Sequence, residues 1–203
     1  MSTDTDDSRR HKEQMRRRDE AFERSMAQAT REKGLLMIHT GAGKGKTTAA
    51  LGLAFRALGH GMKVGIVQFI KGAIATGEGA LVKSLGLPIE MHTLGEGFTW
   101  KTQDRDRDIA AARRGWEKAV ELLRSPSFDL VILDELNIVL RYEYLPLADV
   151  LAELAAKREM LHLVVTGRNA KPELLEMADL VTEMTVIKNP FRHGIKPQRG
   201  IEY

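Results

Sequence analysis

Hydrophobic positions in this chain form short apolar runs separated by longer amphipathic segments. Six runs have the pattern of buried strands, the third of them weakly: residues 35–39, 63–69, 89–93, 129–133, 161–166 and 180–187. Between them, apolar side chains recur every three to four positions, which predicts helices at residues 47–58, 78–85, 104–123, 146–157 and 171–178. Apolar strands that alternate with helices indicate an α/β fold, with a mostly parallel sheet covered by helices on both faces.

The first 33 residues follow a different pattern, because they are polar and densely charged. Met15, Phe22 and Met26 are large apolar residues in this segment, and their spacings of seven and four place them on one helical face. Two interpretations stay open: a solvated helix, or a helix that docks on a partner subunit or a ligand. We therefore predict a charged helical segment at 1–33 and a single α/β domain at 34–203, ending in a basic coil from residue 188.

Composition limits the classes of function. The chain has 203 residues, enough for one domain with its own core, and its lack of cysteine excludes disulfides and thiolate chemistry. A net charge of +3 is too small to indicate a nucleic-acid partner. No apolar run is long enough to cross a bilayer, and the acidic N-terminus does not resemble a secretory signal. We expect a cytoplasmic protein with neither a nucleic-acid nor a membrane partner.

A glycine-rich loop follows the first predicted strand and opens the first helix. It consists of Gly41, Ala42, Gly43, Lys44, Gly45, Lys46, Thr47 and Thr48. Such a loop turns backbone N–H groups toward phosphate oxygens, and the helix N-terminus adds a favourable dipole. We expect Lys46 to bind phosphate and Thr47 to place its hydroxyl on Mg²⁺. Thr40 stands where such loops usually have glycine, so Gly41 and Gly43 predict a different path for the loop.

Two acids, Asp134 and Glu135, directly follow the fourth strand. Parallel sheets bind ligands at the carboxyl ends of their strands, so these carboxylates should lie beside the phosphate loop, where they can bind Mg²⁺. Three interpretations remain open at this point. Glu135 could polarise an attacking water, both acids could hold the metal, or Asp134 could cap a helix.

Residues 95–100 place two large aromatics, Phe98 and Trp100, in a glycine-flanked loop after the third strand. Packing against the next helix is one interpretation. A lid, a protein contact or a wall for a flat apolar ligand are others.

Together these motifs resemble those of the P-loop ATP:corrinoid adenosyltransferases. The matching stretches are residues 40–50, 59–61, 67–72, 97–100, 133–136, 144–147, 166–168 and 200–203. The phosphate loop alone is unspecific, whereas its combination with Phe98-Thr99-Trp100 and with residues 68–72 is specific. The resemblance runs from the charged N-terminal segment to the last residue, and it implies a P-loop NTPase-like (RecA-like) fold.

The resemblance implies transfer of the 5′-deoxyadenosyl group of ATP to the cobalt of a reduced corrinoid, with triphosphate as the second product. It places the triphosphate in loop 41–48, with ATP lying in the reverse sense relative to hydrolases and Lys46 neutralising the leaving group. Thr47 and Glu135 would bind Mg²⁺, or alternatively Mn²⁺, with support from Asp134. One departure is Ala42, where the resemblance leads us to expect Asn.

By the same resemblance, Phe98 and Trp100 pack against the corrin and remove its lower axial ligand, and Arg168 contacts phosphate or corrin. The implied partners are ATP, a corrinoid of the cobalamin, cobinamide or cobyrinate diamide type, and a reduced flavoprotein that donates electrons. A homodimer is implied as well, in adenosylcobalamin biosynthesis or salvage, with residues 1–33 as a lid. The alternatives are a P-loop ATPase or kinase-like phosphotransferase, and a nucleotide-binding regulator without catalytic activity.

Overall fold

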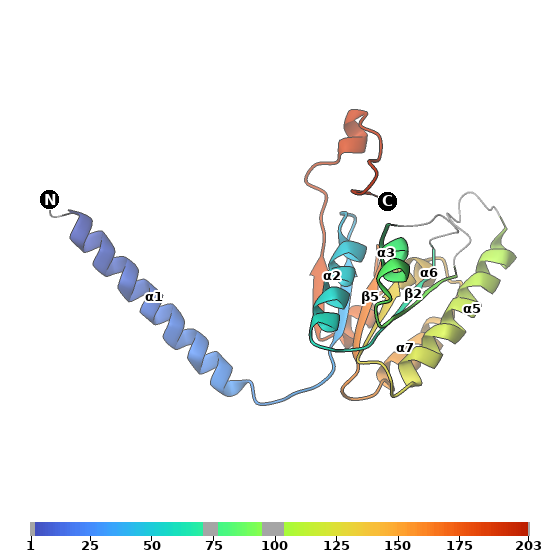
Figure 1. The fold of residues 1–203 in the computed structure, drawn as a ribbon, viewed down its shortest axis with the longest axis horizontal. Helices are drawn as coiled ribbons and strands as arrows, with labels where there is room; N and C mark the ends of the chain where they lie inside the picture. The colour runs from blue at the N-terminus through green and yellow to red at the C-terminus, as the bar shows by residue number, and fades with distance from the viewer. Residues whose placement is uncertain (1–2, 71–76, 95–103, 203) are drawn as a thin grey trace. The chain divides into compact units, whose positions relative to one another are not determined.

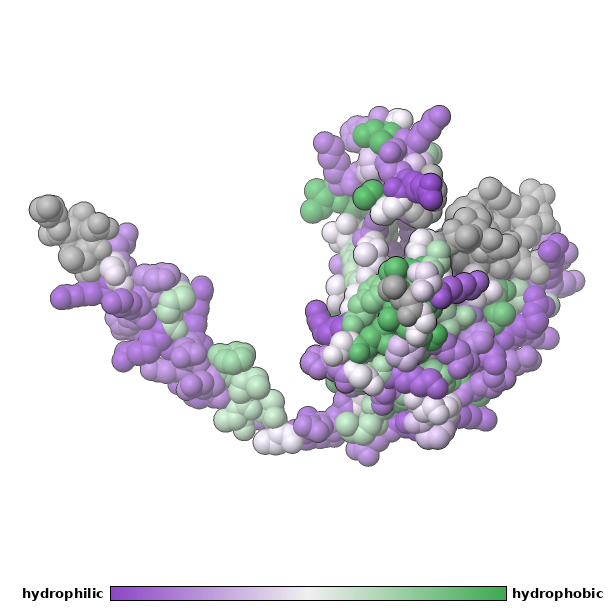
Figure 2. All heavy atoms as spheres, viewed as in Figure 1, coloured by the Kyte–Doolittle hydropathy of each residue, from purple (hydrophilic) through white to green (hydrophobic). Residues whose placement is uncertain are grey.

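The computed structural model describes residues 3–70, 77–94 and 104–202, and the chain divides into two units, Met1–Glu32 and Lys33–Tyr203. The first unit contains helix α1, Thr3–Gln28 (Figure 1). Its side chains from residue 7 onward are exposed, including Phe22 at 63% and Met26 at 57%. Ion pairs one turn apart, such as Arg17 with Glu13 at 2.7 Å, support the helix locally. Figure 2 shows a mostly hydrophilic surface on α1, with apolar side chains toward its C-terminal end.

In the described part of the second unit, six parallel strands form one sheet in the order β3-β2-β4-β5-β1-β6. The strands are β1 (Leu36–Thr40), β2 (Val64–Gln68), β3 (Ile89–Thr93), β4 (Leu130–Asp134), β5 (His162–Thr166) and β6 (Leu180–Glu183). The predicted α/β class with a parallel sheet is confirmed. Because β5 lies between β1 and β4, the segments that follow these three strands meet at one edge of the sheet, as in RecA-like folds.

Helices cover both faces of this sheet. The helices of this unit are α2 (Lys46–Gly59), α3 (Gly77–Leu85), α5 (Arg105–Arg124), α6 (Leu136–Arg141), α7 (Leu147–Ala155) and α8 (Pro172–Met177), and the 3₁₀ turn η1 (Pro190–His193) follows β6 in the C-terminal tail. Side chains that alternate along β1, β4 and β5, and residues of β2, enter two separate apolar clusters. One cluster packs beneath α2, and the other beneath α5, α6, α7 and α8, so the helices lie on opposite sides of the sheet (Figure 1).

Three local predictions differ from the structure. The sixth strand ends at Glu183 rather than at residue 187, because its neighbour β1 ends at Thr40, the residue that pairs with Glu183. Helix α6 lies where we predicted no element, and its six residues are too few to establish a helical period. The C-terminal tail is not coil throughout, because Asn189 caps the turn η1 by accepting a hydrogen bond from Phe191 N at 3.0 Å. No helix among the described residues is both long and apolar enough to cross a membrane.

Candidate active site

The phosphate loop links β1 to α2 and lies against the segment that follows β6. Met184 N donates to Thr40 O at 2.9 Å, and Gly43 N donates to Met184 O at 2.6 Å. A Cβ atom on Gly41 would lie 2.4 Å from Met184 O, and one on Gly43 would lie 2.6 Å from the same oxygen. Glycine is therefore required at both positions because a neighbouring backbone approaches the loop closely. This approach gives a physical reason for the unusual glycine spacing in the sequence.

Lys46 is buried inside this loop, with 6% of its surface exposed. Its Nζ donates to the carbonyl oxygens of Gly41 at 2.8 Å and of Gly43 at 2.5 Å. Burial lowers the pKa of Lys46 below its usual 10.5; Glu135 and Asp134 act in the opposite direction, and Arg168 lowers the pKa further. Two adjacent carboxylates, at the end of β4, and a guanidinium, in the turn after β5, therefore act on the Lys46 ammonium.

The other predicted loop residues lie nearer the surface. Ala42 and Thr48 are exposed, Thr47 is half-buried, and the ammonium of Lys44 is paired with the carboxylate of Glu202 in the C-terminal tail. That ion pair places Glu202 next to the phosphate loop. Gly45 begins α2 with φ of 104°, a left-handed conformation that glycine adopts without a steric penalty.

Asp134 joins the phosphate loop to the ends of the neighbouring strands. It is 1% exposed, and its Oδ1 accepts hydrogen bonds from the hydroxyls of Thr47 at 2.8 Å and Thr166 at 2.7 Å. Its Oδ2 accepts from Gln68 Nε2 at 3.1 Å, and Gln68 Oε1 in turn accepts from Thr93 at 3.1 Å. The N-cap of α6 is Glu135 and not Asp134, so the interpretation of Asp134 as a helix cap is wrong.

Glu135 occupies a strained turn beside the phosphate loop. Its φ of 65° is left-handed, a conformation that costs a residue with a side chain on the order of 1–3 kcal/mol. Its backbone N–H donates to Thr166 Oγ1 at 3.0 Å, which anchors the turn to β5. The Oε2 atom would lie 3.1 Å from a Cβ on Gly167, so this carboxylate packs directly against the turn that carries Arg168.

Arg168 follows β5 in a turn that is hydrogen-bonded to the last two residues of β1. Gly167 N donates to His39 O at 3.1 Å, and Ala170 N donates to Thr40 Oγ1 at 3.1 Å. Gly167 has φ of 128° and Asn169 has φ of 55°. These positive angles on both sides of Arg168 reverse the chain tightly at the carboxyl edge of the sheet.

The oxygen atoms at this edge suit a hard divalent cation. Thr47, Asp134 and Glu135 offer a hydroxyl and two carboxylates, the kind of partial donor set that Mg²⁺ completes with water and substrate phosphates. Within the described ranges, no cluster of three or more His, Asp or Glu side chains forms a closed metal cage.

The structure does not test every predicted residue. Phe98 and Trp100 lie outside the described residues. Sequence reasoning missed Gln68, Thr93 and Thr166 as site residues, although each is the polar last residue of a strand. That pattern could have identified them.

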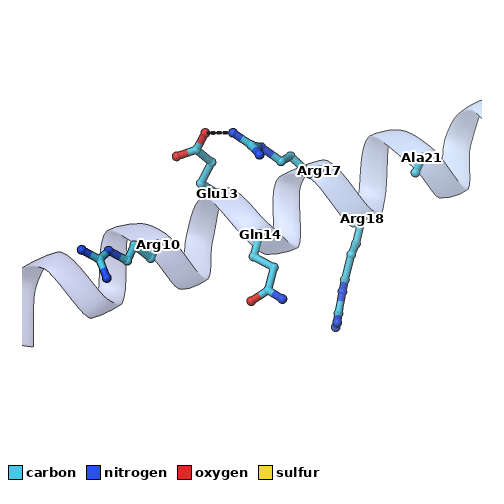
Figure 3. Close-up of a pocket in the computed structure, with 6 residues that line it drawn as sticks. All are labelled: Arg10, Glu13, Gln14, Arg17, Arg18 and Ala21. Carbon is cyan, nitrogen blue, oxygen red and sulfur yellow. Dashed lines mark hydrogen bonds and ion pairs between the residues drawn. The ribbon is translucent and has the colours of Figure 1, made fainter.

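Two further hollows are lined by other residues than those of this site. One, of about 250 Å³, lies between α2 and the amino ends of β1, β4 and β5, at the opposite edge of the sheet. The other follows α1 (Figure 3) and is lined by Arg10, Glu13, Gln14, Arg17, Arg18 and Ala21. Because a single helix supplies all the walls of the second hollow, it is a space between side chains rather than an enclosed site.

Comparison with known proteins gives one consistent family. The family model described as ATP:corrinoid adenosyltransferase BtuR/CobO/CobP matches residues 32–203. The corrinoid adenosyltransferase of Pseudomonas aeruginosa is 50% identical over 203 residues, which cover 100% of both chains. That of Sinorhizobium sp. is 53% identical over 199 residues, covering 97% of this chain and 93% of the relative. That of Escherichia coli is 43% identical over 194 residues, covering 96% and 98%. This chain therefore belongs to the ATP:corrinoid adenosyltransferase family.

Proposed function

We propose that this protein transfers the 5′-deoxyadenosyl group of ATP to the cobalt of a Co(I) corrinoid and releases triphosphate. The observation that carries the proposal is the meeting of Lys46, Asp134, Glu135 and Arg168 around a glycine loop at the carboxyl edge of the sheet. Family membership supplies the reaction, because phosphate binding alone would suit an ATPase equally well. The ATPase and kinase-like alternatives are not favoured.

In this reaction the phosphate loop binds the leaving group. Triphosphate oxygens would replace the carbonyls of Gly41 and Gly43 as partners of the Lys46 ammonium. Backbone N–H groups of residues 41–48 and the N-terminus of α2 add positive potential. These groups would stabilise the charge that develops on triphosphate as it departs, which is where binding energy accelerates the step.

Thr47, Glu135 and Asp134 form the proposed metal site. The Thr47 hydroxyl and the Glu135 carboxylate are the proposed ligands, and Asp134 orients Thr47 through their 2.8 Å hydrogen bond. A bound Mg²⁺, or Mn²⁺ in its place, would neutralise charge on the phosphates.

Bond formation in this proposal needs no general base. The Co(I) electron pair attacks the ribose C5′, the cobalt–carbon bond forms, and the C5′–oxygen bond breaks with its electron pair leaving on triphosphate. The protein contributes alignment of cobalt with C5′, an effect worth up to about 7–11 kcal/mol in favourable cases. Phe98 and Trp100 are proposed to displace the lower axial ligand, which eases the reduction of Co(II).

The remaining parts of the proposal concern partners. A reduced flavoprotein would supply the electron that produces Co(I), and two copies of the chain would form a homodimer in the cytoplasm. The N-terminal helix α1, with Met15, Phe22 and Met26 exposed along its length, is proposed as a lid over the corrin.

The decisive experiment incubates the protein with ATP, Mg²⁺ and a chemically reduced corrinoid. We expect a light-sensitive cobalt–carbon product together with an equal amount of triphosphate. The Lys46→Met variant is the matched control, which we expect to form little of either product. Release of ADP and phosphate in place of triphosphate would reject the proposal and favour the ATPase alternative.

A further inference from the structure

Asn137 is a polar residue in an apolar position. It lies in the first turn of α6 and is 0% exposed, and its neighbours Leu136, Val139 and Leu140 are also buried. Burial of an amide costs free energy unless the amide forms hydrogen bonds, and leucine has nearly the same shape. The amide at this position therefore requires a reason other than packing.

The reason lies in one contact with the turn after β5. Asn137 Nδ2 donates to the carbonyl oxygen of Gly167 at 3.0 Å. This carbonyl belongs to the peptide group that joins Gly167 to Arg168, so the hydrogen bond fixes the plane from which the Arg168 backbone departs. A Cβ on Gly167 would lie 2.8 Å from the Cβ of Asn137, so the two residues are also packed tightly.

Asn137 makes this contact with the NH₂ group of its side-chain amide. Its Oδ1 has no hydrogen-bond partner among the described residues, although it is buried. A buried acceptor of this kind costs on the order of 1–3 kcal/mol. The amide is therefore not part of a complete polar network among the described residues, and the hydrogen bond that it does form is the donation to Gly167.

The other bonds to this turn come from different elements. Gly167 N is held by β1 through His39 O, and Ala170 N is held by the side chain of Thr40. Asn137 adds the contact from α6, whose N-cap is Glu135. The peptide before Arg168 is thereby tied to the short helix that directly follows the acidic pair.

We propose that Asn137 is a positioning residue, which holds the Gly167–Arg168 peptide so that the guanidinium of Arg168 contacts the triphosphate of ATP beside Lys46. This inference rests on the proposed function, because it takes triphosphate as the occupant of the loop. The charge of Arg168 acts on the Lys46 ammonium, so the two cationic side chains lie close enough to bind the same triphosphate. Two cations held near one another without a bound anion repel, and a polyphosphate removes that repulsion.

The test measures binding of inorganic triphosphate with Mg²⁺ by calorimetry, with no corrinoid present. Asn137→Leu removes the donor and retains the packing, and we expect about fivefold weaker binding, the equivalent of one neutral hydrogen bond. In an Arg168→Ala background, the same substitution should cause no further loss. Asn137→Ala serves as a second variant if the leucine variant does not fold.

Val139→Ala is the matched control, because Val139 is buried on the same helix. We expect it to lower the melting temperature without changing triphosphate affinity. An equal loss from Asn137→Leu in the presence and absence of Arg168, or no loss in a folded variant, would overturn the inference. If wild-type protein binds triphosphate as expected but forms no adenosylated corrinoid, the proposed function fails and this positioning role stands.

Discussion

Gly43→Ala tests the path of the phosphate loop with the smallest possible change. A Cβ at residue 43 would lie 2.6 Å from Met184 O and 2.7 Å from Thr185 O, whereas ordinary contacts begin at 3.4 Å. Both neighbours are backbone atoms, so a side-chain rotation cannot relieve the overlap. The loop and the segment after β6 must move apart, and the 2.6 Å hydrogen bond from Gly43 N to Met184 O must stretch or break.

Two terms set the size of the effect. Inserting a methyl group into closely packed backbone costs about 1–3 kcal/mol, and losing the hydrogen bond costs about 1 kcal/mol more. The expected destabilisation is therefore about 2–4 kcal/mol. For a domain of this length, that corresponds to a fall in melting temperature of roughly 5–15 °C.

The assay is scanning calorimetry on Gly43→Ala beside Gly52→Ala, with triphosphate binding measured on both. Gly52 lies in α2, and a Cβ there would meet no atom within 4 Å. The same chemical change should therefore stabilise the protein at residue 52, by about 0.5–1 kcal/mol. Gly43→Ala should also weaken triphosphate binding, because the loop is displaced. The described loop path would be refuted if the Gly43→Ala variant had the melting temperature and the triphosphate affinity of the wild type.

Three further predictions concern the site and the N-terminal segment. Because burial lowers the pKa of Lys46 in the folded protein, the unfolded chain binds more protons between that lowered pKa and the usual 10.5, so wild-type stability should rise with pH across this window. Lys46→Met should lack this rise in thermal melts at a series of pH values, and parallel curves for both proteins would contradict the reasoning. Phe98→Ala or Trp100→Ala should impair adenosylation most when Co(II) must be reduced on the enzyme; equal losses with chemically reduced Co(I) would count against their proposed role. Deleting residues 1–33 should raise the KM for the corrinoid, while circular dichroism should show an intact fold. Unchanged kinetics would show that residues 1–33 do not act as a lid.

The fold was largely predictable because four of the strands, β1, β2, β4 and β5, are mainly apolar runs that end in a polar residue. Their predicted limits differ from the observed ones by a residue or two; for example, β5 begins at His162 and not at residue 161. The sixth strand was predicted too long because strand length depends on the partner as well as on the apolar pattern. Beyond Glu183 the chain has no β1 residue to pair with, since β1 has already turned into the phosphate loop at Gly41.

The candidate site was predictable in its motifs but not in its connections. A glycine loop after one strand and an acidic pair after another place both at the carboxyl edge of any parallel sheet. The bond from Thr166 to Asp134, in contrast, depends on β5 lying beside β4, and strand order is a property of the whole fold. Asn137 was missed for a related reason, because its partner is a backbone carbonyl of Gly167, 30 residues later in the chain.

The hydrogen bonds of Asp134 also distinguish the roles of the two acids. Its Oδ1 already accepts from two hydroxyls and its Oδ2 accepts from Gln68, so direct metal ligation would require breaking one of these bonds. This favours the proposed supporting role for Asp134 and leaves Glu135 as the proposed carboxylate ligand of the metal. In that proposed role, and beside the charge of Lys46, Glu135 would be poorly suited to deprotonate water. That division of labour fits a reaction in which the nucleophile arrives with its electron pair already available, as Co(I) does, better than it fits hydrolysis.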